Sequence, residues 1–158
     1  CPGTAPRPAP PPGLPLLIAI GSRDPVTLAQ VAALPGIPHV AAPNGALPGP
    51  LPVAPVTVVQ MTPGPAPVPP RQAAAQFAAG LARQVAAAPP AMLLVTGGET
   101  ADAILSGLGA GLLVPEGELA PGLPAMRLLD GPTDLRLATK SGGFGAPGLL
   151  AGIVAAAV

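Results

Sequence analysis

The sequence predicts a single α/β domain whose parallel or mixed sheet is flanked by helices in a Rossmann-like layered arrangement. Short, wholly apolar runs, typical of strands buried on both faces, alternate with segments of helical character. Three glycine-rich turns follow such runs directly, as in sheets that bind ligands at their strand ends. The 158 residues, 49% of them apolar, suffice for one hydrophobic core.

The start of the chain is rich in proline and is followed by the first strand and helix. Residues 1–15 are interpreted as an extended linker, and residues 16–158 as the folded domain. Leu16–Ile20 predicts a buried strand. Asp24 and Pro25 are a good cap and first residue for a helix that runs to about Leu34, where Pro35-Gly36 ends it. The expected apolar face of this helix comprises Val26, Ala29, Ala33 and Leu34.

Arg71–Ala88 is the clearest helix, since it is rich in alanine, free of proline, and carries Phe77, Leu81 and Val85 at a four-residue spacing. Two further helices are expected at residues 99–108, with Gly109 as terminator, and at Leu149–Ala157. Further strands are expected at His39–Ala42, Val56–Met61, Met92–Val95, Leu112–Val114, Met126–Leu129 and Leu135–Thr139. The last two strands should pair across the turn at Asp130–Thr133.

Composition argues against several classes of protein. Seven basic and seven acidic residues give no net charge, so no basic stripe is available for a nucleic-acid backbone. Aromatic residues make up 1%, which leaves no set of rings for stacking on single strands. The one cysteine, Cys1, allows no intrachain disulfide and is compatible with the cytoplasm. No apolar run reaches the roughly 20 residues that span a bilayer, so no membrane partner is expected.

The three turns are Gly21–Pro25, Gly97–Thr100 and Lys140–Gly145. A strand that ends in glycines and leads into a helix presents backbone N–H groups at a helix N-terminus, which is an arrangement that binds phosphate. The carboxyl ends of parallel strands meet at one edge of a sheet. The turns therefore predict a nucleotide site built from several strand ends.

Candidate site residues lie in each turn. In the second turn, Gly97 and Gly98 lack a Cβ and permit close approach of a phosphate, while the Thr100 hydroxyl can bond a phosphate oxygen. Glu99 can hold Mg²⁺, through water because Mg²⁺ keeps most of its hydration shell. The alternative is an ordinary strand-to-helix turn in which Thr100 is a cap.

The third turn places Lys140 beside Gly142 and Gly143, where an ammonium group can neutralise a triphosphate. The alternative for Lys140 is a solvated strand end, and Phe144 can stack on a base or pack in the core. A Cβ at Gly97 or Gly142 is expected to block phosphate without unfolding the domain.

In the first turn, Asp24-Pro25 capping explains most of the sequence but leaves the Ser22 hydroxyl without a structural role. His39, the only histidine, has no evident partner, and there is no Cys/His metal spacing. The sequence therefore assigns no catalytic residue.

Read in order, Gly21–Thr27, Gly97–Thr100 and Lys140–Gly145 resemble the C-terminal nucleotide-binding domain of the four-carbon acid sugar kinases, as does Glu118–Pro124. The resemblance extends from about Leu16 to Leu150. It implies a two-domain enzyme in which an N-terminal domain binds threonate, erythronate or 3-oxo-tetronate and the C-terminal domain binds Mg-ATP. By motif match, Ser22 contacts ATP, residues 97–100 cradle phosphates, and residues 142–143 line the nucleotide.

The chain departs from that pattern because the whole acceptor domain is absent. The chain is therefore expected to be inactive alone, to need a sugar-acid-binding domain or chain as partner, and to be cut from a longer protein. Ala101 stands where a small hydroxyl residue is common, and Gly148 where an acidic residue is often found. A second hypothesis is a non-catalytic remnant or interaction domain, whose former interdomain face is compatible with a homodimer. A third is a different ligand, such as a dinucleotide, on a similar sheet.

Overall fold

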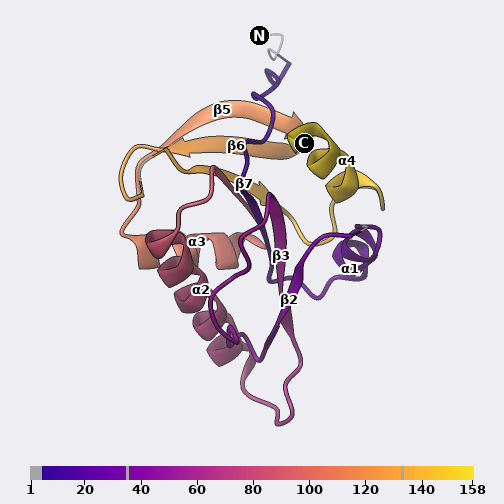
Figure 1. Ribbon diagram of the computed structural model, residues 1–158. Helices are drawn as coiled ribbons and strands as arrows, with labels where there is room; N and C mark the ends of the chain where they lie inside the picture. Colours follow the sequence, from indigo (N-terminus) through magenta and orange to yellow (C-terminus); the bar gives the residue numbers. More distant parts are fainter. Residues whose placement is uncertain (1–4, 35, 133) are drawn as a thin grey trace.

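A seven-stranded sheet with the order β2-β3-β1-β4-β7-β6-β5 forms the centre of the computed structural model, which describes residues 5–34, 36–132 and 134–158 (Figure 1). The strands are β1 (Leu16–Ile20), β2 (His39–Pro43), β3 (Val56–Thr62), β4 (Met92–Thr96), β5 (Leu113–Ala120), β6 (Leu123–Leu128) and β7 (Arg136–Lys140). The helices are α1 (Pro25–Ala32), α2 (Pro70–Ala87), α3 (Gly98–Leu108) and α4 (Leu149–Ala157). The predicted α/β class is confirmed.

The sheet is mixed. The strands β2, β3, β1, β4 and β7 run parallel to one another. At the β7 side of the sheet, β6 pairs with β7 in the antiparallel direction, and β5 pairs with β6 in the same way. Ile20 is the register partner of Thr96, and Thr96 is the register partner of Lys140. The carboxyl ends of β1, β4 and β7 are therefore level, so the three glycine turns leave the sheet side by side.

Two helices cover each face of the sheet, as Figure 1 shows with α2 and α3 on one side and α1 and α4 on the other. The alternation of side chains along β1 explains this, because Leu17 and Ala19 face the core around Phe77 of α2 and Ile104 of α3. The other β1 side chains face the core that α1 and α4 complete. Fully buried strands read as continuous apolar runs, which is why the sequence reveals β1 and β4.

The hairpin of β5 and β6 differs from the prediction, which gave a brief strand at Leu112–Val114 and another strand at Met126–Leu129. The strand β5 is longer and contains Pro115 and Gly117, residues that weaken a strand signal. The register with β6 shifts between Pro115 and Gly117 and again between Glu118 and Ala120. The strand β5 lies at the edge of the sheet, where proline is tolerated. The pairing of β6 with β7 is antiparallel, as predicted. Thr133 of the predicted turn and Pro35 lie outside the described residues.

Part of the segment predicted as a linker lies along β5. We call residues 5–12 the N-terminal strap. The Ala9 N–H donates to the Glu118 carbonyl at 2.8 Å, and the Glu118 N–H donates to the Arg7 carbonyl at 3.0 Å. Gly117 has a φ of +126°, and a Cβ there would run into the Arg7 carbonyl. The glycine is thus required by the close approach of the strap.

A buried arginine fastens the strap to the sheet. Arg136 of β7 donates from Nη1 to the Pro11 carbonyl at 2.8 Å and from Nη2 to the Pro10 carbonyl at 3.0 Å. Its Nε pairs with Glu116 of β5 at 2.5 Å, and the same carboxylate accepts from Arg127 at 3.0 Å. A proline-rich segment has few N–H donors of its own, so side-chain donors to its carbonyls are what hold it in place.

The Glu116 carboxylate predicts a pH dependence of stability. Burial raises the pKa of Glu116, but the hydrogen bonds and charges of Arg136 and Arg127 outweigh it and leave the pKa below its ordinary value. A carboxyl with a lowered pKa in the folded state stabilises the fold above its unfolded pKa of about 4.3, and this stability is lost as pH falls through the folded pKa. We expect Glu116→Gln to lower the melting temperature at pH 7, and the difference from wild type to shrink as the pH falls through the pKa of Glu116 in the folded state. A difference that does not change with pH would contradict the assignment.

Candidate functional site

The carboxyl ends of β1, β4 and β7 bring the three glycine turns into contact. The Gly97 N–H donates to the Lys140 carbonyl at 2.9 Å, which joins the second turn to the end of β7. A Cβ built on Gly21 would lie 2.5 Å from Thr100 Oγ1, and one built on Gly142 would lie 2.5 Å from Ser22 Oγ. Each of the three turns therefore contacts the other two, as expected for strand ends that converge.

In the first turn, Asp24 caps α1 as predicted, since its Oδ1 accepts from the Val26 N–H at 2.8 Å. Ser22 also has a local structural role that the sequence does not reveal, because its Oγ accepts from the Asp24 N–H at 3.1 Å. The Ser22 N–H in turn donates to Thr96 Oγ1 at 3.4 Å. The Ser22 hydroxyl hydrogen remains available for a ligand in this geometry.

In the second turn, α3 begins at Gly98, earlier than predicted, with Gly97 as its N-cap at a φ of +96°. The N-cap position is occupied by Gly97, which has no side chain to bond the helix, so the alternative hypothesis in which Thr100 is the cap is wrong. Within the described chain no side chain bonds the first N–H groups of α3. Gly98 is exposed and Thr100 half-buried. The helix thus presents free donors with a partial positive charge.

Glu99, the candidate for Mg²⁺, is exposed in the first turn of α3, where a carboxylate also favours the helix dipole. Within residues 5–34, 36–132 and 134–158, no group of three or more His, Cys, Asp or Glu side chains is arranged to hold a metal ion. Any Mg²⁺ here would depend on the oxygens of a phosphate ligand and on water, which suits the coordination preference of this ion.

In the third turn, Lys140 is buried rather than solvated, with 1% of its surface exposed. The Lys140 Nζ donates to the Ser141 carbonyl at 2.8 Å, to Thr27 Oγ1 at 3.0 Å and to the Gly142 carbonyl at 3.1 Å. Burial lowers the pKa of Lys140, and the charge of Asp24 opposes that effect. The reading of Lys140 as a solvated strand end is wrong, since its ammonium group binds the backbone of the turn that follows it.

Two buried polar residues of α1, Thr27 and Gln30, bind the same turn. Thr27 Oγ1 donates to the Gly142 carbonyl at 2.6 Å, and Gln30 Nε2 donates to the carbonyls of Phe144 at 3.0 Å and Ala146 at 2.9 Å. The sequence reading missed them because it placed the buried face of this helix elsewhere. The structure buries Thr27, Gln30 and Val31 and leaves Ala29 and Ala33 exposed. Their three-residue spacing on one face was the available signal.

The two other residues singled out from the sequence have structural surroundings. The ring of Phe144 is half-buried and lies against Gly122, where a Cβ would come within 2.5 Å of it. Phe144 thus ties the third turn to the tip of the β5–β6 hairpin, which includes part of the Glu118–Pro124 segment. His39 is exposed at the amino end of β2, away from the glycine turns.

The glycines of the turns differ in what the fold requires of them. Gly97 needs its positive φ, and Gly142 packs on Ser22 Oγ and on Asp24 Cβ. Valine at either position would therefore strain the fold, contrary to the expectation from the sequence. A Cβ at Gly98 meets nothing within 4 Å, and one at Gly143 would lie 3.3 Å from Asp24 Oδ2. Gly98 is the position at which a side chain tests ligand approach alone.

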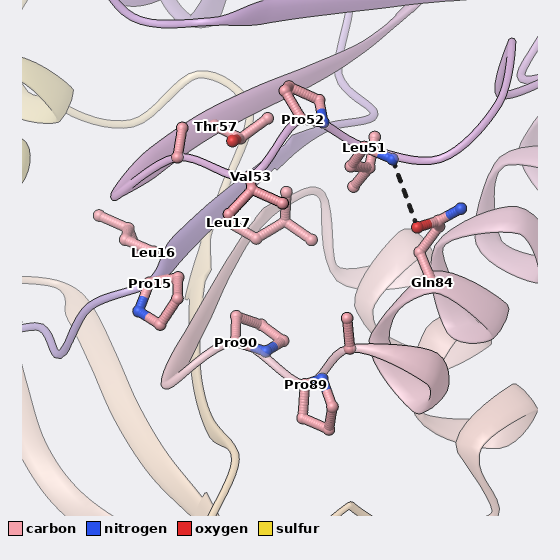
Figure 2. A pocket seen from close by; sticks show the side chains of 12 residues that line it. Pro15, Leu16, Leu17, Leu51, Pro52, Val53, Thr57, Gln84, Pro89 and Pro90 are labelled. Carbon is pink, nitrogen blue, oxygen red and sulfur yellow. Dashed lines mark hydrogen bonds between the residues drawn. The ribbon is translucent and has the colours of Figure 1, made fainter.

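Two cavities in the described part of the chain lie away from the turns. The one in Figure 2 encloses about 250 Å³ at the amino ends of β1 and β3, where Leu16, Leu17 and Thr57 line it with Pro89 and Pro90. The other is lined by residues between the end of α2 and the end of α3. Neither is lined by a residue of the glycine turns. The turns thus offer a surface rich in backbone donors at the opposite end of the sheet.

Comparison with known proteins adds to this geometry. Residues 56–150, which contain the second and third turns, match the family model of the nucleotide-binding C-terminal domain. The chain belongs to this family. The C-terminal nucleotide-binding domain expected from the resemblance is thereby confirmed. Of the segments that carried the resemblance, the one with the first turn lies outside the matched residues.

Solved structures with the same fold come from the DUF1537 family. A Bordetella bronchiseptica protein of this family, crystallised with bound citrate as a domain-swapped dimer, is 25% identical with a TM-score of 0.73, over 92% of this chain and 40% of its own. A Haemophilus influenzae member is 21% identical with a TM-score of 0.69, over 97% of this chain and 42% of its own. This nucleotide-binding C-terminal domain thus spans about 40% of the length of these relatives.

No curated protein sequence matches the nucleotide-binding C-terminal domain described here. In the part of the chain that the structure describes, no helix combines the length and the apolar character needed to cross a membrane.

Proposed function

We propose that this chain is the ATP-binding part of a sugar-acid kinase, which holds Mg-ATP at the three glycine turns. A separate N-terminal domain would hold the four-carbon sugar acid, and a hydroxyl group of this sugar acid would receive the γ-phosphate. The observation that carries the proposal is the convergence of the turns at the level ends of β1, β4 and β7, in a chain of the nucleotide-binding C-terminal family. Ligands of open α/β sheets bind at this end of the strands.

The start of α3 is the proposed seat of the phosphate chain. Gly98 leaves open space above the backbone, so a phosphate oxygen can reach the first N–H groups of the helix. The Thr100 hydroxyl lies beside Gly21 and can donate to the same ligand. Glu99 would contact Mg²⁺ through water, and the phosphates would supply the direct ligands.

The buried ammonium of Lys140 and the hydroxyl of Ser22 complete the proposed site. Lys140 would act on the phosphates through its charge, because its hydrogens are bound to Thr27 and to two carbonyls of the turn. A fixed charge in a water-poor surrounding needs no reorganisation when the ligand arrives. The sugar acid with its acceptor hydroxyl, and the base that deprotonates that hydroxyl, would be held by the separate N-terminal domain, so this domain alone would bind nucleotide without turning it over.

A second candidate is an interaction domain, with a homodimer as its simplest form. It is favoured by the apolar side chains exposed near the antiparallel side of the sheet, Leu112, Val114 and Leu129. These residues lie close together, because the Leu129 N–H donates to the Leu112 carbonyl at 2.9 Å and Val114 is the partner of Arg127 in the hairpin. Exposed apolar patches mark contact surfaces.

Thermal unfolding with and without Mg-ATP distinguishes the two candidates. A ligand at one hundred times its Kd stabilises the native state by about 2.7 kcal/mol, which for a chain of this size raises the melting temperature by about 5–10 °C. We expect that rise with Mg-ATP and a smaller one with adenosine. A melting temperature that ignores Mg-ATP but increases with protein concentration would instead support the interaction domain.

A further inference from the structure

Three carbonyl groups of the third turn, and that of the residue that follows it, accept hydrogen bonds from buried side chains. The donor cluster, defined here as Thr27, Gln30 and Lys140, binds them all. The carbonyls belong to Ser141, Gly142, Phe144 and Ala146. Thr27 and Gln30 are fully buried and Lys140 is 1% exposed, so water does not compete for these bonds.

The planar peptide unit converts these bonds into a direction for the neighbouring N–H groups. In a trans peptide, the C=O of one residue and the N–H of the next point in opposite directions. The N–H groups opposite the carbonyls of Ser141, Gly142 and Phe144 belong to Gly142, Gly143 and Gly145. The carbonyl of Ala146 is followed by Pro147, which has no N–H. Every N–H directed away from the donor cluster therefore belongs to a glycine.

The three glycine amides, of Gly142, Gly143 and Gly145, are free of protein acceptors. Among the described residues, none of them donates to a backbone or side-chain oxygen. In contrast, the Phe144 N–H donates to the Ser141 carbonyl at 3.1 Å. Backbone amides that converge without a Cβ between them form a concave site for an oxyanion.

Burying these donors is costly, which argues for a purpose beyond packing. Gln30 Oε1 is buried and finds no partner among the described residues, an arrangement that costs about 1–3 kcal/mol. A buried ammonium group also loses its hydration. An apolar residue at each of these two positions would avoid its cost, so we infer that what the cluster provides is the fixed conformation of the turn.

We propose that Thr27, Gln30 and Lys140 are positioning residues that hold the carbonyls of the third turn inward, so that the three glycine amides present their N–H groups to an oxyanion of the nucleotide's phosphate chain. The inference rests on the proposed function for the identity of the ligand. It adds Thr27, Gln30 and Gly145 to the site, and it gives Lys140 a role through the backbone in addition to its charge.

The test follows the amide resonances of the glycines in ¹⁵N-labelled full chain titrated with Mg-ATP and, separately, with inorganic triphosphate. We expect the three glycine amides to shift in wild type with both ligands. In Thr27→Val, which removes one hydroxyl with little change in shape, we expect triphosphate to bind about tenfold more weakly, so that these shifts are much smaller at a concentration near the wild-type Kd. Adenosine binding should change little, and Thr27→Ser should restore the shifts.

A matched control is Thr57→Val, since Thr57 is buried on β3 and lines the cavity at the other end of the sheet. It should leave the glycine shifts unchanged even where it lowers the melting temperature as much as Thr27→Val does. The inference is overturned if the glycine amides ignore triphosphate in wild type, if Thr27→Val binds it normally, or if serine fails to restore the shifts. Triphosphate shifts without any binding of Mg-ATP would overturn the proposed function but support the inference.

Discussion

Gly98→Val is expected to abolish the binding of Mg-ATP while leaving the melting temperature of the free protein nearly unchanged. Gly98 is the first residue of α3, is exposed, and has open space where its Cβ would be. Valine is accommodated there without a steric clash, and it is a better helix residue than glycine. The same side chain would stand between a phosphate and the first amides of the helix. Calorimetry should show at least about a tenfold loss of affinity, or roughly 1.4 kcal/mol.

Gly152→Val is the matched control, because Gly152 lies within α4 and a Cβ there also meets nothing within 4 Å. This variant should bind Mg-ATP like wild type. Wild-type affinity in Gly98→Val would remove the start of α3 from the site, whatever the behaviour of the third turn. A large fall in the melting temperature of free Gly98→Val would show that the open position has a structural role.

Arg136→Leu is expected to cause a large loss of stability. The change leaves the largely buried Glu116 with only Arg127 beside it and removes the donors to Pro10 and Pro11. Removing one partner of a buried ion pair costs about 3–5 kcal/mol. For a chain of this size that corresponds to a fall of about 6–20 °C in melting temperature.

Hydrogen exchange locates the effect. The amides of Ala9 and Glu118, which bond across the strap and β5, should exchange much faster in Arg136→Leu than in wild type. Arg127→Leu is the control, since Arg127 is half-exposed and its pair with Glu116 should contribute less than about 1 kcal/mol. If Arg136→Leu left the exchange of Ala9 and Glu118 unchanged, the strap would be held without Arg136, by its backbone bonds to β5 and by packing.

The fold was predictable where burial on both faces makes the sequence unambiguous. Leu16–Ile20 is a strand with the predicted bounds, and Gly109 ends α3 in the left-handed conformation that the sequence indicated. The β5–β6 hairpin was underestimated because an edge strand accepts proline and glycine, the residues that normally argue against a strand. The buried face of α1 was wrong because Thr27 and Gln30 are polar, and hydrophobic periodicity does not detect them.

The location of the site was predictable from the sequence, but the hydrogen bonds among its side chains were not. Strand ends in parallel register must converge, and the contacts among Gly21, Thr100, Ser22 and Gly142 follow from that rule. What side chains do there depends on partners more than a hundred residues away, such as Thr27 and Gly142. No local pattern encodes such a pairing, and this is why the sequence did not show that Lys140 is enclosed by α1 and its own turn.

The strap also limits the pairing of the edge strand β5 with other molecules. The backbone groups at the rim of a sheet template the addition of a foreign strand, which is a common route to aggregation. Because the chain's own proline-rich residues occupy that rim at Glu118, a neighbouring molecule finds no vacant ladder there. If these residues were detached, the backbone groups of β5 would be free to pair with another molecule. Self-association at high concentration should therefore accompany the loss of Arg136, which holds the strap.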